Sequence, residues 1–239
     1  MKKLLLLFTK DGLQYQLAER GNVIEGRSFF IENETDAYLI HHKLREILAK
    51  KSIGSIQAVS AINHFSMMPK GFERHEMAHS LISYNAPVKK DKEELTLSYN
   101  KKYKIQFYYA LPKEYYREMQ SRNIPHTLGF SGNKLLNSIQ TKNQKEMHIN
   151  LYFQQCEFVA LDEKKVVLYN NLDIRSDVDF LYFVLFTLDK IEFSSKDTHF
   201  FIYGEVVENE TFISELRKFV NNVKICYENS HKKHFILNY

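Results

Sequence analysis

The order of apolar segments between residues 145 and 228 constrains the fold more than any other feature of this sequence. Three short apolar runs separated by polar turns come first, and the second alternates apolar with polar residues, as a half-buried strand does. A helix, a strand, a second helix and a last strand should follow. The expected segments are 147–153, 156–161, 166–172, the helix 178–193, 200–203, the helix 209–221 and 223–227. This is the element order of a ribonuclease H-like unit, which is a mixed α/β layer.

The first quarter of the chain repeats this pattern 143 positions earlier. Residues 13–15 align with residues 156–158, and the expected helix N-cap Asn33 aligns with Ser176. The match is one of pattern, with few identical residues, and it needs no gap over about sixty positions. Two ribonuclease H-like units in tandem predict the actin-like ATPase fold, with a first lobe at 1–143 and a second at 144–239.

Residues 65–100 interrupt the repeat and predict an insertion into the first lobe. Pro69 suits the first turn of a helix that reaches about Ser83. Two strands, at 95–99 and 103–110, should follow this helix. We therefore expect a small α+β insertion. After it, the sequence predicts a helix at 112–122, a strand at 127–130 and a linking helix at 131–141.

Composition excludes several classes of protein. The formal charge of +4 is small and scattered over 239 residues, which argues against a nucleic-acid partner. No apolar run approaches the roughly 20 residues of a transmembrane helix. The two cysteines, Cys156 and Cys226, are isolated, and this pattern indicates a reducing compartment. We expect a soluble cytoplasmic protein without a transmembrane segment.

The helix expected at 178–188 is apolar around most of its circumference. A helix of this kind must be covered on more than one side. We therefore expect it to pack on its own sheet and also against the other lobe or the preceding linker helix.

The first hairpin carries half of a phosphate-binding signature. In the actin-like fold, one hairpin from each lobe clasps phosphate, and each carries Asp and Gly followed by a hydroxyl residue. Here Asp11 and Gly12 are present, but Leu13 replaces the hydroxyl. A type I′ turn also explains an Asp-Gly pair.

The second hairpin lacks this signature. Its tip contains Gln154 and Gln155, with neither Asp nor Gly. The turn expected on the adenosine side holds Gly204 and Glu205, which is one glycine of the usual pair. We take these residues, with Asp11 and Gly12, as the candidate cofactor-binding set.

Residues 75–79 read His-Glu-Met-Ala-His, a pattern that on a helix can bind zinc and activate water. The flanking charges of Glu73 and Arg74 differ from those of a metalloprotease helix. Glu114 and Glu118 are the candidates for a third ligand by distance along the chain alone. We interpret His75 and His79 as part of a solvated helix face and assign neither a metal ligand nor a catalytic residue.

Several segments resemble an uncharacterised bacterial family, known only as a domain of unknown function, whose members have an actin-like ATPase fold. The resemblance covers nearly the whole chain and is clearest at 68–69, 110–114, 166–170, 179–182 and 202–205. It implies the fold and no reaction. More distant similarity to pilus-assembly and cell-division proteins of the actin-like group implies a scaffold next to a membrane, by analogy of fold only.

These observations leave two functions from different classes. The first is a degenerate actin-like protein that binds a protein partner and does not turn over ATP, for which we expect no cofactor. The alternative is an ATP-binding ATPase or phosphotransferase that uses Mg²⁺ with Asp11 and the Gly204 turn. A zinc hydrolase built on His75, Glu76 and His79 is a distant third. The sequence leaves the oligomeric state open, a dimer included.

Overall fold

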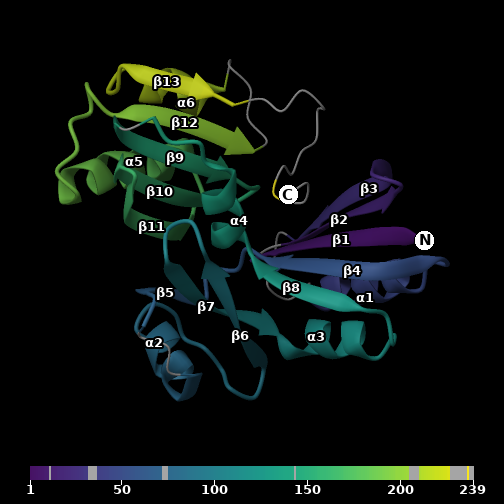
Figure 1. The fold of residues 1–239 in the computed structure, drawn as a ribbon. Helices are drawn as coiled ribbons and strands as arrows, with labels where there is room; N and C mark the ends of the chain where they lie inside the picture. The colour runs from purple at the N-terminus through teal and green to yellow at the C-terminus, as the bar shows by residue number, and fades with distance from the viewer. Residues whose placement is uncertain are drawn as a thin grey trace. The chain divides into compact units, whose positions relative to one another are not determined.

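The structure, a computed structural model, describes residues 1–10, 12–31, 37–71, 75–142, 144–204, 210–226 and 236. The chain divides into two compact units, unit 1 at Met1–Lys134 and unit 2 at Leu135–Tyr239 (Figure 1). This division lies nine residues before the lobe boundary expected at 143/144, so the expected domain limits stay a prediction.

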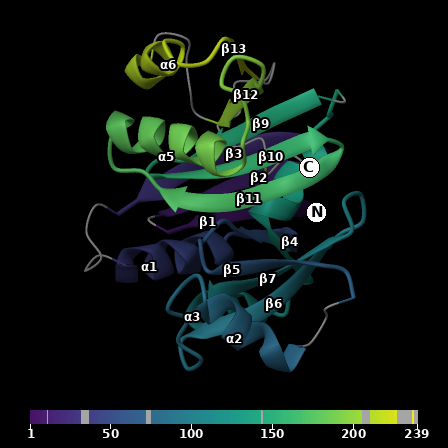
Figure 2. The same ribbon diagram turned by 90° about the vertical axis from the view of Figure 1, so that its left-hand side faces the viewer.

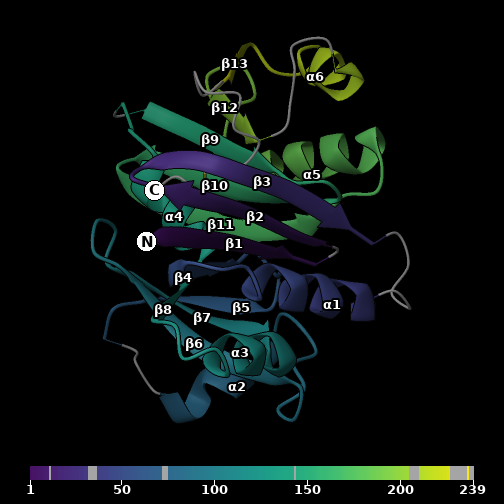
Figure 3. The same ribbon diagram turned by 90° about the vertical axis from the view of Figure 1, so that its right-hand side faces the viewer.

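Unit 1 contains a five-stranded sheet in the order β3-β2-β1-β4-β8. Figure 3 shows β3, β2, β1 and β4 side by side in this order. The antiparallel strands β1 to β3 come first in the chain, and β4 and β8 continue the sheet in parallel. The elements are β1 (Lys2–Thr9), β2 (Gly12–Glu19), β3 (Asn22–Phe30), α1 (Ala37–Leu48), β4 (Ile53–Ser60), α3 (Lys113–Gln120) and β8 (His126–Phe130).

A second, three-stranded sheet of unit 1 forms the insertion, in the order β5-β7-β6. It extends to Pro112, beyond the end expected at residue 100. The expected helix start at Pro69 is wrong, because Pro69 is the last residue of β5 and pairs with Ile105, but a helix does end at the expected Ser83. The elements are β5 (Phe65–Pro69), the 3₁₀ turn η2 (His75–Met77), α2 (Ala78–Ser83), β6 (Glu93–Asn100) and β7 (Ile105–Pro112).

Unit 2 contains one five-stranded sheet in the order β11-β10-β9-β12-β13. The helix α4 (Ser131–Ser138) spans the division between the units. The remaining elements are β9 (Gln144–Leu151), β10 (Gln155–Glu163), β11 (Lys165–Asp173), α5 (Asp177–Lys190), β12 (His199–Gly204), α6 (Thr211–Leu216) and β13 (Asn222–Ile225). No helix within the described ranges is long and apolar enough to cross a membrane.

The two five-stranded sheets share their strand order and their register. Leu6 pairs with Tyr15 in unit 1, and 143 positions later Ile149 pairs with Phe158 in unit 2. The strands that carry these pairs lie in separate sheets, as two lobes of the same topology require. The alignment inferred from the sequence therefore places the first hairpin of each sheet correctly.

The two sheets also share an irregularity in the pairing of their second and third strands. The register shifts between Leu17 and Ala18 where β2 meets β3, and between Ala160 and Leu161 where β10 meets β11. A β-bulge inserts an extra residue at a defined place. The two register shifts lie at equivalent positions, so the similarity of the two units covers all three antiparallel strands.

The alignment without a gap is wrong by one residue beyond these strands. Leu4 pairs with Ile56 between β1 and β4, whereas Met147 pairs with Phe200 between β9 and β12. The offset has changed from 143 to 144, so unit 2 contains one additional residue between its third and fourth strands.

The helix α5 packs on its own sheet and against α6, where the Phe180 and Phe212 ring centroids lie 5.0 Å apart, and leaves one face exposed. Its outward face exposes Val178 (73%), Tyr182 (57%) and Phe186 (46%), and Figure 2 shows the helix in front of the strands of its own sheet. The expected contact of α5 with the other lobe or with the linker helix stays a prediction. The inward face packs into the core of unit 2 through Phe180, Val184, Thr187 and Leu188.

Candidate functional site

A cavity of about 370 Å³ lies in unit 2 next to the second hairpin. Its volume falls within the range of small-ligand pockets, about 300–1,000 Å³. Three separate segments meet there, namely the hairpin after β9, the start of α5, and α6. The lining residues are Leu151, Tyr152, Phe153, Gln154, Ile174, Arg175, Ser176, Asp177, Phe180 and Phe212.

The second hairpin forms one wall, and most of its polar groups bond within the protein. The backbone N–H of Tyr152 donates to the carbonyl of Gln155 (2.8 Å), and the N–H of Ile174 donates to the carbonyl of Gln154 (2.9 Å). The Gln155 side chain is buried, and its Nε2 donates to Oδ1 of Asn171 (2.6 Å). Of the two glutamines expected to meet phosphate, Gln155 is therefore structural, and Gln154 lines the cavity.

The beginning of α5 forms a second wall that already carries negative charge. Oγ of the N-cap Ser176 accepts from the N–H of Asp179 (3.1 Å), and Oδ2 of Asp179 accepts from the N–H of Arg175 (3.0 Å). Asp177 and Asp179 both lie in the first turn. Carboxylates at this end of a helix occupy the position where a phosphate would bind.

An acidic residue does lie behind the hairpin, but its carboxylate is fully engaged by neutral donors. Oε2 of Glu157 accepts from Nδ2 of Asn150 (3.0 Å) and from the Tyr152 hydroxyl (2.7 Å). Oε1 accepts from the Tyr169 hydroxyl (2.7 Å). Glu157 is 0% exposed. A carboxylate buried in this network is not presented to Mg²⁺ at the hairpin tip.

A second buried polar group lies on the same face of the sheet. Nε2 of His148 lies 3.0 Å from Oε2 of Glu146, and Nδ1 lies 2.9 Å from the Tyr203 hydroxyl. Burial would raise the pKa of Glu146, but the contact with His148 and the N–H of Lys142 outweigh it and lower that pKa. The apolar run predicted at 147–153 does not indicate this group. The signal was the alternation of polar residues at 146, 148 and 150.

The first hairpin departs from the expected geometry at Gly12. This residue lies in β2, pairs with Thr9 and Phe30, and has no left-handed backbone conformation. The expected Asp-Gly type I′ turn is therefore wrong. A Cβ at Gly12 would lie 2.6 Å from the carbonyl oxygen of Phe29, so close approach of β3 requires the glycine. Asp11 lies outside the described residues.

Gly204 also has a structural role in a sheet, that of unit 2. It pairs with Leu151 at the end of β12, and a Cβ there would lie 2.1 Å from the Leu151 carbonyl oxygen. Its φ of +95° is in the left-handed region that favours glycine. The packing of β12 on β9 explains this glycine without a ligand. Glu205 lies outside the described residues.

The His-Glu-Met-Ala-His segment does not lie on one regular helix. Residues 75–77 form a 3₁₀ turn and α2 begins at Ala78. Nε2 of His79 contacts the carbonyl oxygen of Val88 at 3.1 Å, a bond that holds the loop after α2. Among the described residues, no three metal-ligating side chains gather closely enough to hold an ion. Glu73 and Arg74 lie outside the described residues.

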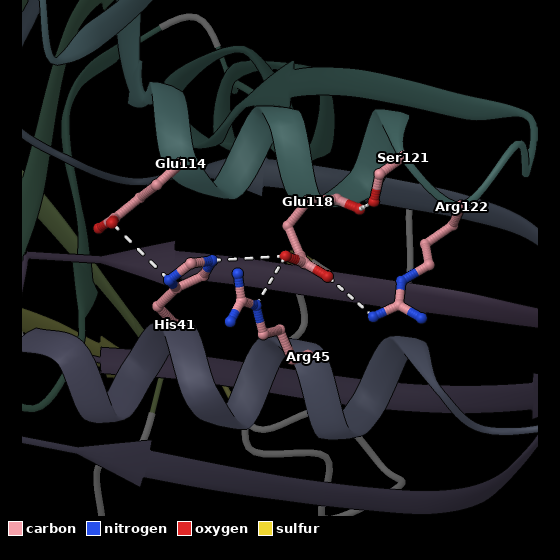
Figure 4. Close-up of polar contacts among 6 residues, drawn as sticks. All are labelled: His41, Arg45, Glu114, Glu118, Ser121 and Arg122. Carbon is pink, nitrogen blue, oxygen red and sulfur yellow. Dashed lines mark hydrogen bonds and ion pairs between the residues drawn. The ribbon is translucent and has the colours of Figure 1, made fainter.

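The two glutamates considered as third ligands belong to a different cluster, between α1 and α3 (Figure 4). Oε2 of Glu118 accepts from Nε of Arg45 (2.8 Å), and Oε1 accepts from Nη2 of Arg122 (2.8 Å). Burial would raise the pKa of Glu118, but these two hydrogen bonds lower it. The ring of His41 lies 3.5 Å from Glu118 and 3.8 Å from Glu114. This network joins two helices.

The comparisons with known proteins agree with this geometry. Residues 1–223 match the family described as "Protein of unknown function (DUF3822)". A Bacteroides thetaiotaomicron protein, described as having an actin-like ATPase fold and unknown function, is 18% identical with a TM-score of 0.78, over 94% of this chain and 90% of that chain. None of the curated proteins matches the sequence.

Two further solved structures share the fold at lower identity. The PilM-PilN type IV pilus biogenesis complex contains a chain with a TM-score of 0.61 and 10% identity, over 95% of this chain and 88% of that chain. The cytoplasmic domain of EpsL, an inner membrane component of the type II secretion system of Vibrio cholerae, has a TM-score of 0.54 and 8% identity, over 100% and 93%. The actin-like ATPase fold is therefore established for this chain.

Proposed function

The chain belongs to the DUF3822 family, and from this premise we propose that it is a degenerate actin-like protein that binds a protein partner without turning over ATP. We also propose that its two halves are a duplicated ribonuclease H-like unit and that it acts in the cytoplasm. The shared register of the two sheets supports the duplication.

The state of Glu157 carries the proposal. ATP turnover in this fold needs both hairpins to grip one phosphate chain, because positioning and charge stabilisation supply nearly all the catalysis. Glu157, a buried acid behind the second hairpin, accepts hydrogen bonds on both carboxylate oxygens, from Asn150, Tyr152 and Tyr169. Gln154 and Gln155 can donate hydrogen bonds but cannot balance the charge of Mg²⁺.

The chemistry of the cavity favours an apolar side chain as its occupant. Leu151, Phe153, Ile174, Phe180 and Phe212 make up half of the ten lining residues, and Phe153 is 54% exposed. Apolar pockets with a few charged groups at the rim are typical of sites that anchor a partner side chain. The solved PilM structure in complex with PilN is consistent with partner binding on this fold.

An ATP-binding enzyme is the second candidate, because the fold is that of ATPases. Calorimetry with Mg-ATP and a phosphate-release assay distinguish the two. We expect no release above background and at most weak binding. Micromolar affinity that is lost in Asp11→Ala, together with phosphate release, would establish the enzyme instead.

Partner binding has its own test. The purified chain is used to capture proteins from a lysate of its own source, with Phe153→Ser as the variant and Phe219→Ser as the control. Phe219 is equally exposed (50%) but does not line the cavity. We expect the captured protein to be lost only with Phe153→Ser. Equal capture by both variants would exclude the cavity as the binding site.

A further inference from the structure

One end of the three-stranded sheet in unit 1 carries a cluster of lysines. Two segments that are distant in sequence meet there, namely residues 69–71 at the end of β5 and residues 99–105 at the turn between β6 and β7. Pro69 and Asn100 both pair with Ile105, and the N–H of Lys70 donates to the carbonyl of Lys104 (3.0 Å). We call this cluster the lysine tip. Its members are all exposed and are Lys70, Lys101, Lys102 and Lys104.

The positive charge of the lysine tip is not balanced locally. Its two segments contain four lysines and neither Asp nor Glu. Among the described residues, no ion pair involves Lys70, Lys101 or Lys104. The opposite end of β6, at residues 89–94, has three lysines and three acidic residues, so its charges cancel. An uncompensated excess of positive charge therefore distinguishes the lysine tip from the other end of the same strand.

Two tyrosine rings lie beside lysines of the tip. Nζ of Lys70 lies 5.5 Å from the centroid of the Tyr99 ring, and Nζ of Lys102 lies 5.0 Å from the centroid of the Tyr103 ring. Both tyrosines are half-buried. Single-stranded nucleic acids bind by stacking their bases on aromatic side chains. Because each ring is half-buried and faces an ammonium group, the tip offers charge and not a stacking surface.

The two segments contain lysine and no arginine. The planar fork of arginine recognises a carboxylate in one fixed geometry, whereas lysine is a hydrated point charge on a flexible stem. Lysines therefore suit anionic groups that are closely spaced but mobile, as lipid headgroups are. We propose that the lysine tip binds a membrane surface that contains anionic phospholipids. This binding is independent of the proposed partner site, because the tip belongs to unit 1 and the cavity to unit 2.

Co-sedimentation of the full chain with lipid vesicles tests the proposal. The probes are vesicles of phosphatidylcholine alone and vesicles that also contain phosphatidylserine, which is anionic. We expect the wild type to bind only the second kind, and to bind it more weakly as the salt concentration rises, because salt screens exposed charges. Each lysine near an anionic surface strengthens binding roughly fivefold. Lys101→Gln combined with Lys104→Gln should therefore weaken binding by roughly 25-fold.

The matched control is Lys89→Gln combined with Lys90→Gln, which removes the same charge from two exposed lysines at the opposite end of β6. A strand of this length spans about 26 Å, well beyond the screening length of about 8 Å, so the control should bind within about twofold of the wild type. Thermal unfolding checks that both double variants keep the fold. The proposal would be overturned by a wild type without preference for phosphatidylserine, by equal losses in both double variants, or by tighter binding to a single-stranded oligonucleotide at the same salt concentration.

Discussion

The helices α1 and α5 follow the third strand in two sheets of the same strand order, but their outward faces differ in chemistry. Outward residues of α1 are mixed: Nζ of Lys43 lies 2.9 Å from the Glu46 carboxylate, and His42 contacts the same carboxylate at 3.1 Å, whereas Tyr38 is an exposed ring. The corresponding face of α5 is apolar. The inward faces of both helices are apolar and buried. Packing on the sheet thus constrains one side of each helix, and the other side can differ with function.

The sheets themselves differ at one pair of equivalent positions. Gln14 pairs with Leu7, and 143 positions later Glu157 pairs with Asn150. Both side chains are buried, but neither amide atom of Gln14 meets a hydrogen-bond partner among the described residues. Glu157 has three donors. The equivalent position therefore holds a hydrogen-bonded carboxylate in unit 2 and an amide without a hydrogen-bond partner among the described residues in unit 1.

The largest expected effect tests whether the inward faces are equivalent. Leu44→Ala in α1 and Leu188→Ala in α5 should each lower the free energy of unfolding by about 2–5 kcal/mol, because each removes a buried core side chain. Urea unfolding followed by circular dichroism measures both. His42→Ala and Phe186→Ala are the outward controls and should stay within about 0.5 kcal/mol of the wild type. A loss below about 1 kcal/mol at either leucine would break the equivalence.

The next effect separates Gln14 from Glu157. Glu157→Leu should lower the free energy of unfolding by about 3 kcal/mol, because three buried donors lose their acceptor. Gln14→Leu should be neutral or stabilising, because the replacement removes buried polar atoms that have no partner. Urea unfolding of the two variants compares them directly. Equal losses at the two positions would show that Gln14 is bonded as well as Glu157.

The smallest effect concerns the ion network between α1 and α3, which joins two helices of unit 1. The pKa of Glu118 is lowered in the folded protein. Its stabilising contribution is therefore present above the pKa of the unfolded chain and is lost as the pH falls through the folded pKa. Glu118→Gln should lower the free energy of unfolding by about 1 kcal/mol near neutral pH.

Thermal unfolding over a pH series checks this sign. The difference between Glu118→Gln and the wild type should vanish in acid, where both side chains are neutral. Glu46→Gln, which alters an exposed pair on α1, is the control and should show a smaller difference. A difference for Glu118→Gln that persists unchanged in acid would assign the effect to packing instead of charge.

The local pattern of apolar and turn residues predicts most of the fold. The order of strands and helices, the pairing of the first hairpin in each unit and the offset of 143 follow from apolar periodicity and turn residues. The errors came where pattern is ambiguous. Pro69 suits a strand end as well as a first helical turn.

The sequence by itself determined the architecture. The period of apolar residues in a helix or strand depends only on neighbours a few residues apart, so it can be recognised without knowing any distant contact. Only the tertiary structure decided the candidate site. The cavity joins residues 151–154, 174–177, 180 and 212, and Glu157 accepts hydrogen bonds from β9, the hairpin and β11. Gly204 is a glycine because the backbone of β9 lies against it. These are contacts between segments far apart in the chain, and no local pattern specifies them.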